Sequence, residues 1–160
     1  MGGFVSIDVA WLEENVLHRK LTDSEKDQLD GVIERMEFSR GDTIMTEGES
    51  GGALYLLRSG AAEILRESKG KQHRLRTVYE GALLGELTFL TGESVTATIV
   101  ASQDSAVYKM NRSGYSKLMQ ANQELVYAMF AYILAYTTST IRQMNEDHAE
   151  ILDYMTGIHK

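Results

Sequence analysis

Residues Gly81–Ala101 read GALLGELTFLTGESVTATIVA. The apolar run Ala82–Leu84 predicts a short strand, and Glu86–Leu90 predicts a single helical turn. A polar turn, Thr91–Ser94, leads into a β-branched run, Val95–Val100, which predicts another strand. The stretch is therefore expected to fold as strand, helical turn and strand.

Gly85 and Glu86 lie where the first of these strands meets the helical turn. A glycine at a strand end lets the backbone approach a ligand closely. Backbone N–H groups at the start of a short helix attract an anion, and the carboxylate of Glu86 suits a ligand hydroxyl. The local chemistry predicts a cradle for a sugar phosphate.

The same stretch resembles the phosphate-binding cassette of the cyclic nucleotide-binding domain, the family of catabolite activator protein and the protein kinase A regulatory subunits. Gly85, Glu86 and Leu87 match its Gly-Glu-Leu, and Thr96–Ala101 matches its closing strand. The resemblance implies that Glu86 accepts a hydrogen bond from a ribose hydroxyl. It also implies cyclic AMP or cyclic GMP as the ligand, with Thr96 donating to a phosphate oxygen.

The sequence departs from the family pattern at Val95, where the family has the arginine that neutralises the cyclic phosphate. A charge-assisted hydrogen bond contributes about 1.5–3 kcal/mol. Its loss predicts binding weaker by roughly one to two decades. Two purely structural alternatives to these ligand contacts stay open. In one, Glu86 satisfies backbone N–H donors at the start of the helical turn. In the other, Thr96 is an ordinary strand residue.

A basic cluster on one predicted hairpin offers a replacement for the missing cation. Its members are Arg66, Lys69, Lys71, Arg74 and Arg76. One of them would have to reach into the cradle. The favoured interpretation is a solvated hairpin tip.

Short strand signals separated by turn residues fill the middle of the chain. Eight strands are predicted: Glu37–Ser39, Asp42–Met45, Ala53–Arg58, Ala61–Glu67, His73–Tyr79, Ala82–Leu84, Thr96–Ala101 and Ala106–Asn111. Such even spacing predicts a mainly β fold, an eight-stranded antiparallel jelly roll with flanking helices.

Helical patterns flank this region on both sides. A helix is predicted near Asp8–Leu17, and a second begins at Thr22, where Glu25 completes a capping box. The second helix is expected to carry a buried stripe of Leu29, Val32, Ile33 and Met36. We therefore expect one domain, with N-terminal helices at 1–36, the β-roll at 37–111 and C-terminal helices at 112–160.

The C-terminal segment predicts a short helix over Arg112–Asn122 and a long one that runs to about Met155. The long helix has a mostly apolar set of residues at a and d positions, with Asp147 as the exception. Its members are Val126, Phe130, Ile133, Thr137, Thr140, Met144 and Ile151. This seam predicts a homodimer, with Leu125, Met129, Tyr132 and Tyr136 facing the β-roll. The alternative is that the seam itself covers the roll.

Ser139 and Thr140 lie where the catabolite activator family places a contact to the nucleotide base. The resemblance makes them candidate ligand contacts. The alternative is a polar position within the dimer seam.

Composition excludes several other function classes. The net charge of −7 argues against nucleic acid as a partner. The absence of cysteine excludes disulfides and thiol catalysis and fits a cytoplasmic protein. No metal-binding histidine pattern occurs, and the longest apolar run, Leu125–Tyr136, is too short for a membrane span.

Together these features predict a regulatory sensor rather than an enzyme. A ligand bound near Glu86 would move the long helix relative to the β-roll by shifting a pre-existing equilibrium. The competing hypothesis is a ligand-free protein-interaction or dimerisation module.

Overall fold

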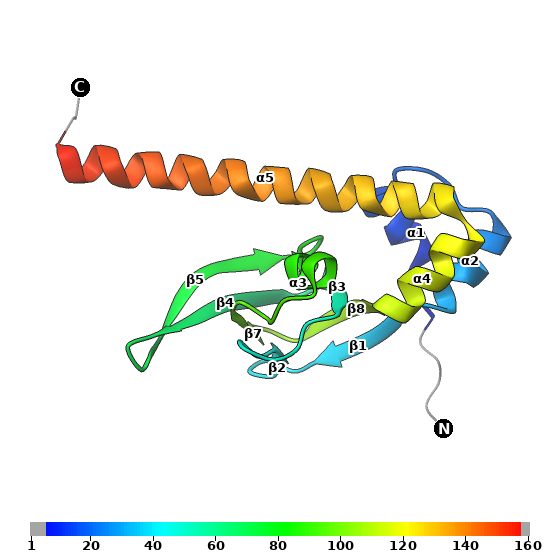
Figure 1. The fold of residues 1–160 in the computed structure, drawn as a ribbon, viewed down its shortest axis with the longest axis horizontal. Coiled ribbons are helices and arrows are strands. Elements are labelled where there is room, and N and C mark those ends of the chain that lie inside the picture. Colours follow the sequence, from blue (N-terminus) through cyan, green and yellow to red (C-terminus); the bar gives the residue numbers. More distant parts are fainter. Residues whose placement is uncertain (1–5, 158–160) are drawn as a thin grey trace.

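The computed structural model describes residues 6–157, and the outermost residues of the predicted N- and C-terminal segments lie outside this range. Two four-stranded antiparallel sheets pack against one another, and helices cover one side of the sandwich (Figure 1). The first sheet has the order β1-β8-β3-β6 and the second β2-β7-β4-β5. The predicted antiparallel jelly roll is confirmed.

The eight strands occur close to their predicted places. They are β1 (Glu34–Phe38), β2 (Thr43–Met45), β3 (Ala53–Ser59), β4 (Ala61–Ser68), β5 (Lys71–Tyr79), β6 (Leu83–Leu84), β7 (Thr98–Ala101) and β8 (Ser105–Asn111). The strand predicted to begin at Thr96 begins two residues later. Only β4 and β5 form a long hairpin of sequence neighbours, whereas β1 pairs with β8 and β2 with β7.

The predicted boundary between the second helix and the β-roll is wrong by three residues. The helix α2 (Asp23–Asp30) has the expected capping box but ends at Gly31. Met36 lies on β1, where it pairs with Val107 of β8. The ladder with β8 overrides the helical pattern, because those long-range hydrogen bonds are invisible to local periodicity.

Four further helical segments surround the sheets at or near the predicted places. They are α1 (Val9–Leu12), the π-helical turn η1 (Glu13–Leu17), α4 (Arg112–Ala121) and α5 (Gln123–Thr156). In Figure 1, α5 runs along the whole length of the sandwich, while α1, α2 and α4 gather at one end. No helix of residues 6–157 combines the length and the apolarity that crossing a membrane requires.

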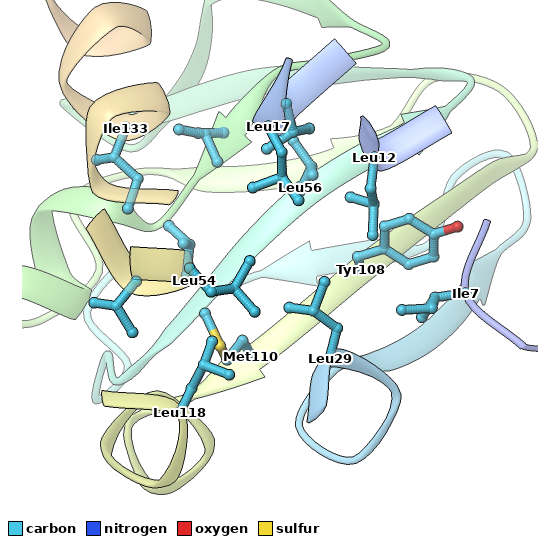
Figure 2. Packing of buried hydrophobic residues seen from close by; sticks show 14 of the residues in the cluster. Ile7, Leu12, Leu17, Leu29, Leu54, Leu56, Tyr108, Met110, Leu118 and Ile133 are labelled. Atoms are coloured by element: carbon cyan, nitrogen blue, oxygen red, sulfur yellow. The ribbon is translucent and has the colours of Figure 1, made fainter. Parts of the chain in front are cut away.

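The core has two layers, because successive residues of a strand point to opposite faces. Leu57 of β3 and Val107 of β8 are fully buried between the sheets. Their neighbours Leu56 and Tyr108 face the helices instead, in the cluster that Figure 2 shows. The central strands β3 and β8 therefore contribute to both layers.

The start of α5 packs onto this second layer. Leu125, Val126 and Ile133 are its only buried side chains among the described residues. The predicted roll-facing set Leu125, Met129, Tyr132 and Tyr136 does pack against the core. The sequence predicts Val126 and Ile133 in the dimer seam, but both are buried in their own protomer. The apolar face at the start of α5 is broad enough to include them together with the roll-facing set.

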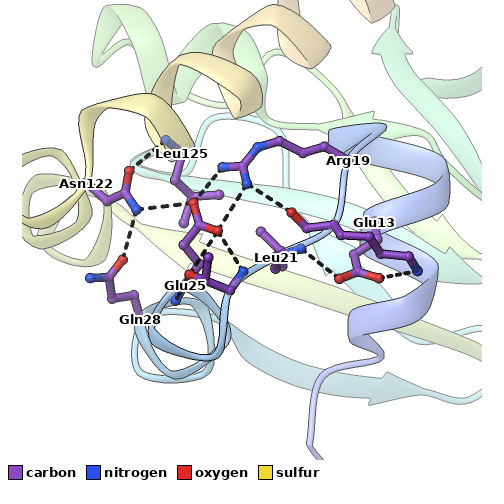
Figure 3. A network of polar contacts seen from close by, with 9 residues as sticks. Glu13, Arg19, Leu21, Glu25, Gln28, Asn122 and Leu125 are labelled. Atoms are coloured by element: carbon purple, nitrogen blue, oxygen red, sulfur yellow. Dashed lines mark hydrogen bonds and ion pairs between the residues drawn. The ribbon is translucent and has the colours of Figure 1, made fainter.

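A polar network ties η1, α2 and the start of α5 together (Figure 3). The carboxylate of Glu25 accepts hydrogen bonds from both terminal nitrogens of Arg19 at 3.0 and 2.6 Å and from the Thr22 amide at 2.9 Å. The side-chain amide of Asn122 donates to it at 3.3 Å. The contacts with Arg19 and, after them, those with Thr22 lower the pKa of Glu25 to about 2.

We expect Glu25→Gln to lower the free energy of unfolding at neutral pH by about 1.5–3 kcal/mol, the contribution of hydrogen bonds to a charged group. Because the folded-state pKa lies below the ordinary value of 4.5, this stabilisation is present above pH 4.5. It is lost as the pH falls toward about 2. Urea unfolding of both proteins at several pH values measures the effect.

Asp23→Asn is the matched control, since Asp23 has an almost fully exposed side chain and forms an ion pair with Lys26 in the same helix. Its cost should stay below about 1 kcal/mol. Equal losses for the two variants would contradict a special role for Glu25.

Candidate ligand pocket

A pocket of about 560 Å³ lies between the β6–α3 connection, the β4–β5 hairpin and the far half of α5. The helix α3 spans Glu86–Thr91. The five cassette residues singled out in the sequence line this pocket together: Gly85, Glu86, Leu87, Val95 and Thr96. The residues come from two segments that meet only through the tertiary fold.

Gly85 sets the geometry of the cassette. Its φ of +73° lies in the left-handed region that favours glycine. A Cβ atom at this position would lie 2.8 Å from the Met45 methyl and 2.9 Å from the Ala53 carbonyl oxygen. The carbonyl of Gly85 accepts the amide of Phe89 at 2.9 Å, which closes the first turn of α3.

The other end of α3 is attached to α4. Arg112, the first residue of α4, donates from Nη2 to the Phe89 carbonyl at 2.8 Å. The Phe89 ring also meets the Tyr115 ring edge-on, with centroids 5.4 Å apart. These two contacts join α3 directly to α4, which leads into α5.

Glu86 is half-buried at the start of α3, on the pocket wall. Burial raises the pKa of its carboxyl group, and the positive charge of Arg76 acts in the opposite direction. A carboxylate in this position can accept hydrogen bonds from the hydroxyl groups of a ligand.

Val95 belongs to both the pocket wall and the core between the sheets, and only 7% of it is exposed. Its amide donates to the Glu49 carbonyl at 2.9 Å, and its carbonyl accepts the Gly48 amide at 2.8 Å. The backbone here is firmly held, and the cassette provides no positive charge at this position.

Ser139 and Thr140 lie outside the set of residues that line the pocket. The contribution of α5 comes from one to three turns further along, from Met144, Asp147, His148 and Ile151. The sequence analysis missed these as pocket residues because a long helix shows no local signal for which of its turns faces a cavity.

The basic hairpin divides into two groups. Arg66 and Arg76 line the pocket, whereas Arg74 donates to Glu63 at 3.0 Å. The interpretation of a solvated tip is therefore wrong for Arg76, which is half-buried, whereas Arg66 lines the pocket with an exposed side chain. Arg76 lies two residues before the buried Val78 and so shares its face of β5. A bulge, where Ile64 pairs with Arg76 and the next residue of β4 pairs with Arg74, breaks the alternation between Arg76 and Arg74.

The comparisons with known proteins agree with this geometry. The family model described as "Cyclic nucleotide-binding domain" matches residues 35–122, from β1 through α4 to Asn122, the N-cap residue of α5. The chain belongs to the cyclic nucleotide-binding domain family. The domain is 31% identical over 117 residues to a cAMP-dependent protein kinase regulatory subunit of Aspergillus niger, which covers 73% of this chain and 28% of that protein.

Solved structures share the fold. A cyclic nucleotide-binding domain from Methylobacillus flagellatus superposes with a TM-score of 0.76 at 19% identity, covering 87% of this chain and 79% of that one. Thermus thermophilus catabolite activator protein gives 0.62 at 28% identity, covering 88% and 62%. The domain spans only about a quarter of the length of the curated kinase regulatory subunits that it matches.

Substitution of Gly85 tests the tight approach in the cassette. We expect Gly85→Ala to cost more stability than Gly48→Ala, because both glycines have a left-handed φ but a Cβ at Gly48 meets nothing within 4 Å. The left-handed backbone costs about 1–2 kcal/mol in either variant. The contact with the Ala53 carbonyl should add about 1–3 kcal/mol to Gly85→Ala alone.

Urea unfolding of the two variants beside the wild type provides the measurement. Equal stabilities for Gly85→Ala and Gly48→Ala would show that the cassette backbone relaxes freely around the added methyl group.

Proposed function

We propose that this domain is a regulatory sensor that binds a ribose-containing ligand in the pocket beneath α5 and does not itself catalyse a reaction. The observation that carries the proposal is the convergence of Gly85, Glu86 and Thr96 on one pocket wall. Family membership and the kinase regulatory subunits among the relatives support it.

The route from pocket to output runs through α3. A ligand that contacts Glu86 favours one position of α3, and Arg112 and the Phe89–Tyr115 contact couple that position to α4. Since α4 continues into α5 at Asn122, the long helix shifts with it. A ligand achieves this only if it binds one helix position more tightly than the other.

Cyclic AMP and cyclic GMP are proposed as weak ligands, because Val95 leaves the cyclic phosphate without the cassette cation. A relative of the same fold, a regulatory subunit of a cAMP-independent protein kinase A from Trypanosoma cruzi, is described as bound to guanosine. Ligands without a phosphate therefore belong in any binding panel.

Val95→Arg tests the role of the missing charge. We expect this variant to bind cyclic AMP or cyclic GMP more tightly than the wild type by about 1.5–3 kcal/mol, the contribution of a guanidinium–phosphate contact. Adding Glu86→Ala should remove much of the gain, because the ribose contact is then lost. Isothermal titration calorimetry measures both changes.

Because Val95 is buried, urea unfolding must first show that Val95→Arg still folds. Micromolar or tighter binding by the wild type would contradict the proposed weakness. If a folded Val95→Arg binds no nucleotide, the favoured function becomes that of a ligand-free interaction module.

We also propose that two copies pair in parallel through α5. The pairing row keeps Phe130, Thr137, Met144 and Ile151 of the predicted seam, and its other positions lie one residue further along the helix. The exposed heptad row consists of side chains spaced alternately by three and four residues, all of them exposed except the half-buried Thr137. Its members are Tyr127, Phe130, Leu134, Thr137, Ile141, Met144, His148, Ile151 and Met155.

The spacing supports a second copy as the occupant of this row. Apolar residues repeating every 3.5 positions on average are what a two-stranded coiled coil needs. The positions that flank the row carry a single charged side chain, Asp147, so parallel pairing brings no like charges together.

The exposed heptad row and the pocket share Met144, His148 and Ile151. A strict heptad drifts by about 20° per repeat around a straight helix, which carries the row toward the pocket side at the end of α5. Pairing of the helices and occupation of the pocket therefore act on the same side chains. This overlap supports a sensor whose ligand changes dimer stability.

Charges placed on the exposed heptad row should prevent pairing. We expect the double variant Leu134→Glu, Ile141→Glu to sediment as a monomer at concentrations where the wild type is a dimer, because it buries four carboxylates in the dimer interface. Sedimentation velocity is the measurement.

Leu90→Glu is the control, since Leu90 is exposed to a similar degree on α3 and lies off the row. It should leave the dimer intact. A monomeric wild type would contradict the pairing.

A further inference from the structure

Two side chains of opposite charge line the pocket from different elements. Glu86 comes from α3 and Arg76 from β5. Neither takes part in any ion pair formed among residues 6–157. The pocket therefore holds an acceptor and a charged donor with space between them.

The neighbouring arginines of the hairpin are placed differently. Arg74 is bound to Glu63 at 3.0 Å, and its side chain is 65% exposed. Arg66 lines the pocket but lies 3.9 Å from Glu47, with its side chain 63% exposed. Arg76 is half-buried. Of the two arginines that line the pocket, it is the one without a carboxylate partner among the described residues.

The charge of Arg76 reaches the inner side of the pocket. It opposes the effect of burial on the pKa of Glu86, and it does the same for the pKa of Tyr136 on α5. Arg76 and Glu86 both line the pocket, whereas Tyr136 lies outside its lining. The charge of Arg76 therefore acts within the pocket rather than only at the tip of the hairpin.

We propose that Arg76 binds an acceptor oxygen of the ligand while Glu86 accepts hydrogen bonds from its ribose, so that β5 provides the cation that the cassette lacks. This inference rests on the proposed sensor function. A guanidinium presents a planar set of donors that fits a phosphate or the O6 and N7 edge of guanine. The shared chemistry is an acceptor oxygen, and the ligand panel must distinguish its two sources.

Four ligands separate the sources: cyclic GMP has both a phosphate and a guanine carbonyl, cyclic AMP only the phosphate, guanosine only the carbonyl, and adenosine neither. Calorimetry or ligand-observed NMR would measure each with the wild type, Arg76→Gln and the control Arg74→Gln. Arg74 lies on the same strand and outside the pocket lining. Urea unfolding checks that both variants fold.

We expect Arg76→Gln to weaken binding about tenfold or more for ligands that carry the recognised oxygen, the size of one charge-assisted hydrogen bond. Adenosine affinity and every affinity of Arg74→Gln should stay at the wild-type level. A loss confined to the two cyclic nucleotides would assign Arg76 to the phosphate. A loss confined to cyclic GMP and guanosine would assign it to the base.

The affinity of Arg76→Lys should lie between those of the wild type and Arg76→Gln, because lysine keeps the charge and loses the planar set of donors. If the ligands bind and Arg76→Gln matches Arg74→Gln, the role of Arg76 is overturned while the sensor function stands. A loss that includes adenosine would also overturn it, because Arg76 would then act through Glu86 or the fold. Failure of all four ligands to bind the wild type would overturn the sensor function and this inference with it.

Discussion

The arrangement of the long helix depends on the packing of three side chains into the core beneath it: Leu125, Val126 and Ile133. Each fully buried side chain of this kind contributes about 1.5–3 kcal/mol, and all three lie in the first three turns of α5. The last six turns have no buried side chain in the described structure. Most helical stability in proteins comes from the packing of an apolar face, so the stability of the outer half of α5 depends on what it contacts.

That dependence gives the domain its regulatory character. The pocket and the exposed heptad row both use the outer half of α5, and both offer apolar surface that it can bury. In the proposed function, a ligand or a second helix orders or repositions this half, while the inner half keeps its place on the sandwich. The Glu25 network strengthens this division, because it anchors only the start of the helix through Asn122.

Val95 shows how one residue serves two requirements that conflict. As a core residue between the sheets it contributes apolar burial, and as a cassette residue it stands where the family places a cation. A charged side chain in that core position would carry a desolvation cost. The domain combines a well-packed cassette with an arginine from outside the cassette, Arg76, in the pocket lining.

The sequence by itself determined the elements of this protein, because strand alternation, turn residues and caps are local signals. For each of the eight strands, the capping box at Thr22 and the Gly-Glu-Leu edge, the residues that carry the signal lie within a few positions of one another. Even the absence of the cassette arginine is a local fact.

Only the tertiary structure decided which side chains face the ligand, because facing depends on partners distant in the sequence. Pairing with β8 moved the start of the sheet to Glu34, and the bulge in β5 separated the pocket residue Arg76 from Arg74. Packing of α5 buried Val126 and Ile133 and left the neighbouring row, with Leu134 and Ile141, exposed. A helix repeat identifies an apolar stripe, but the sandwich beneath it determines which edge of that stripe stays exposed.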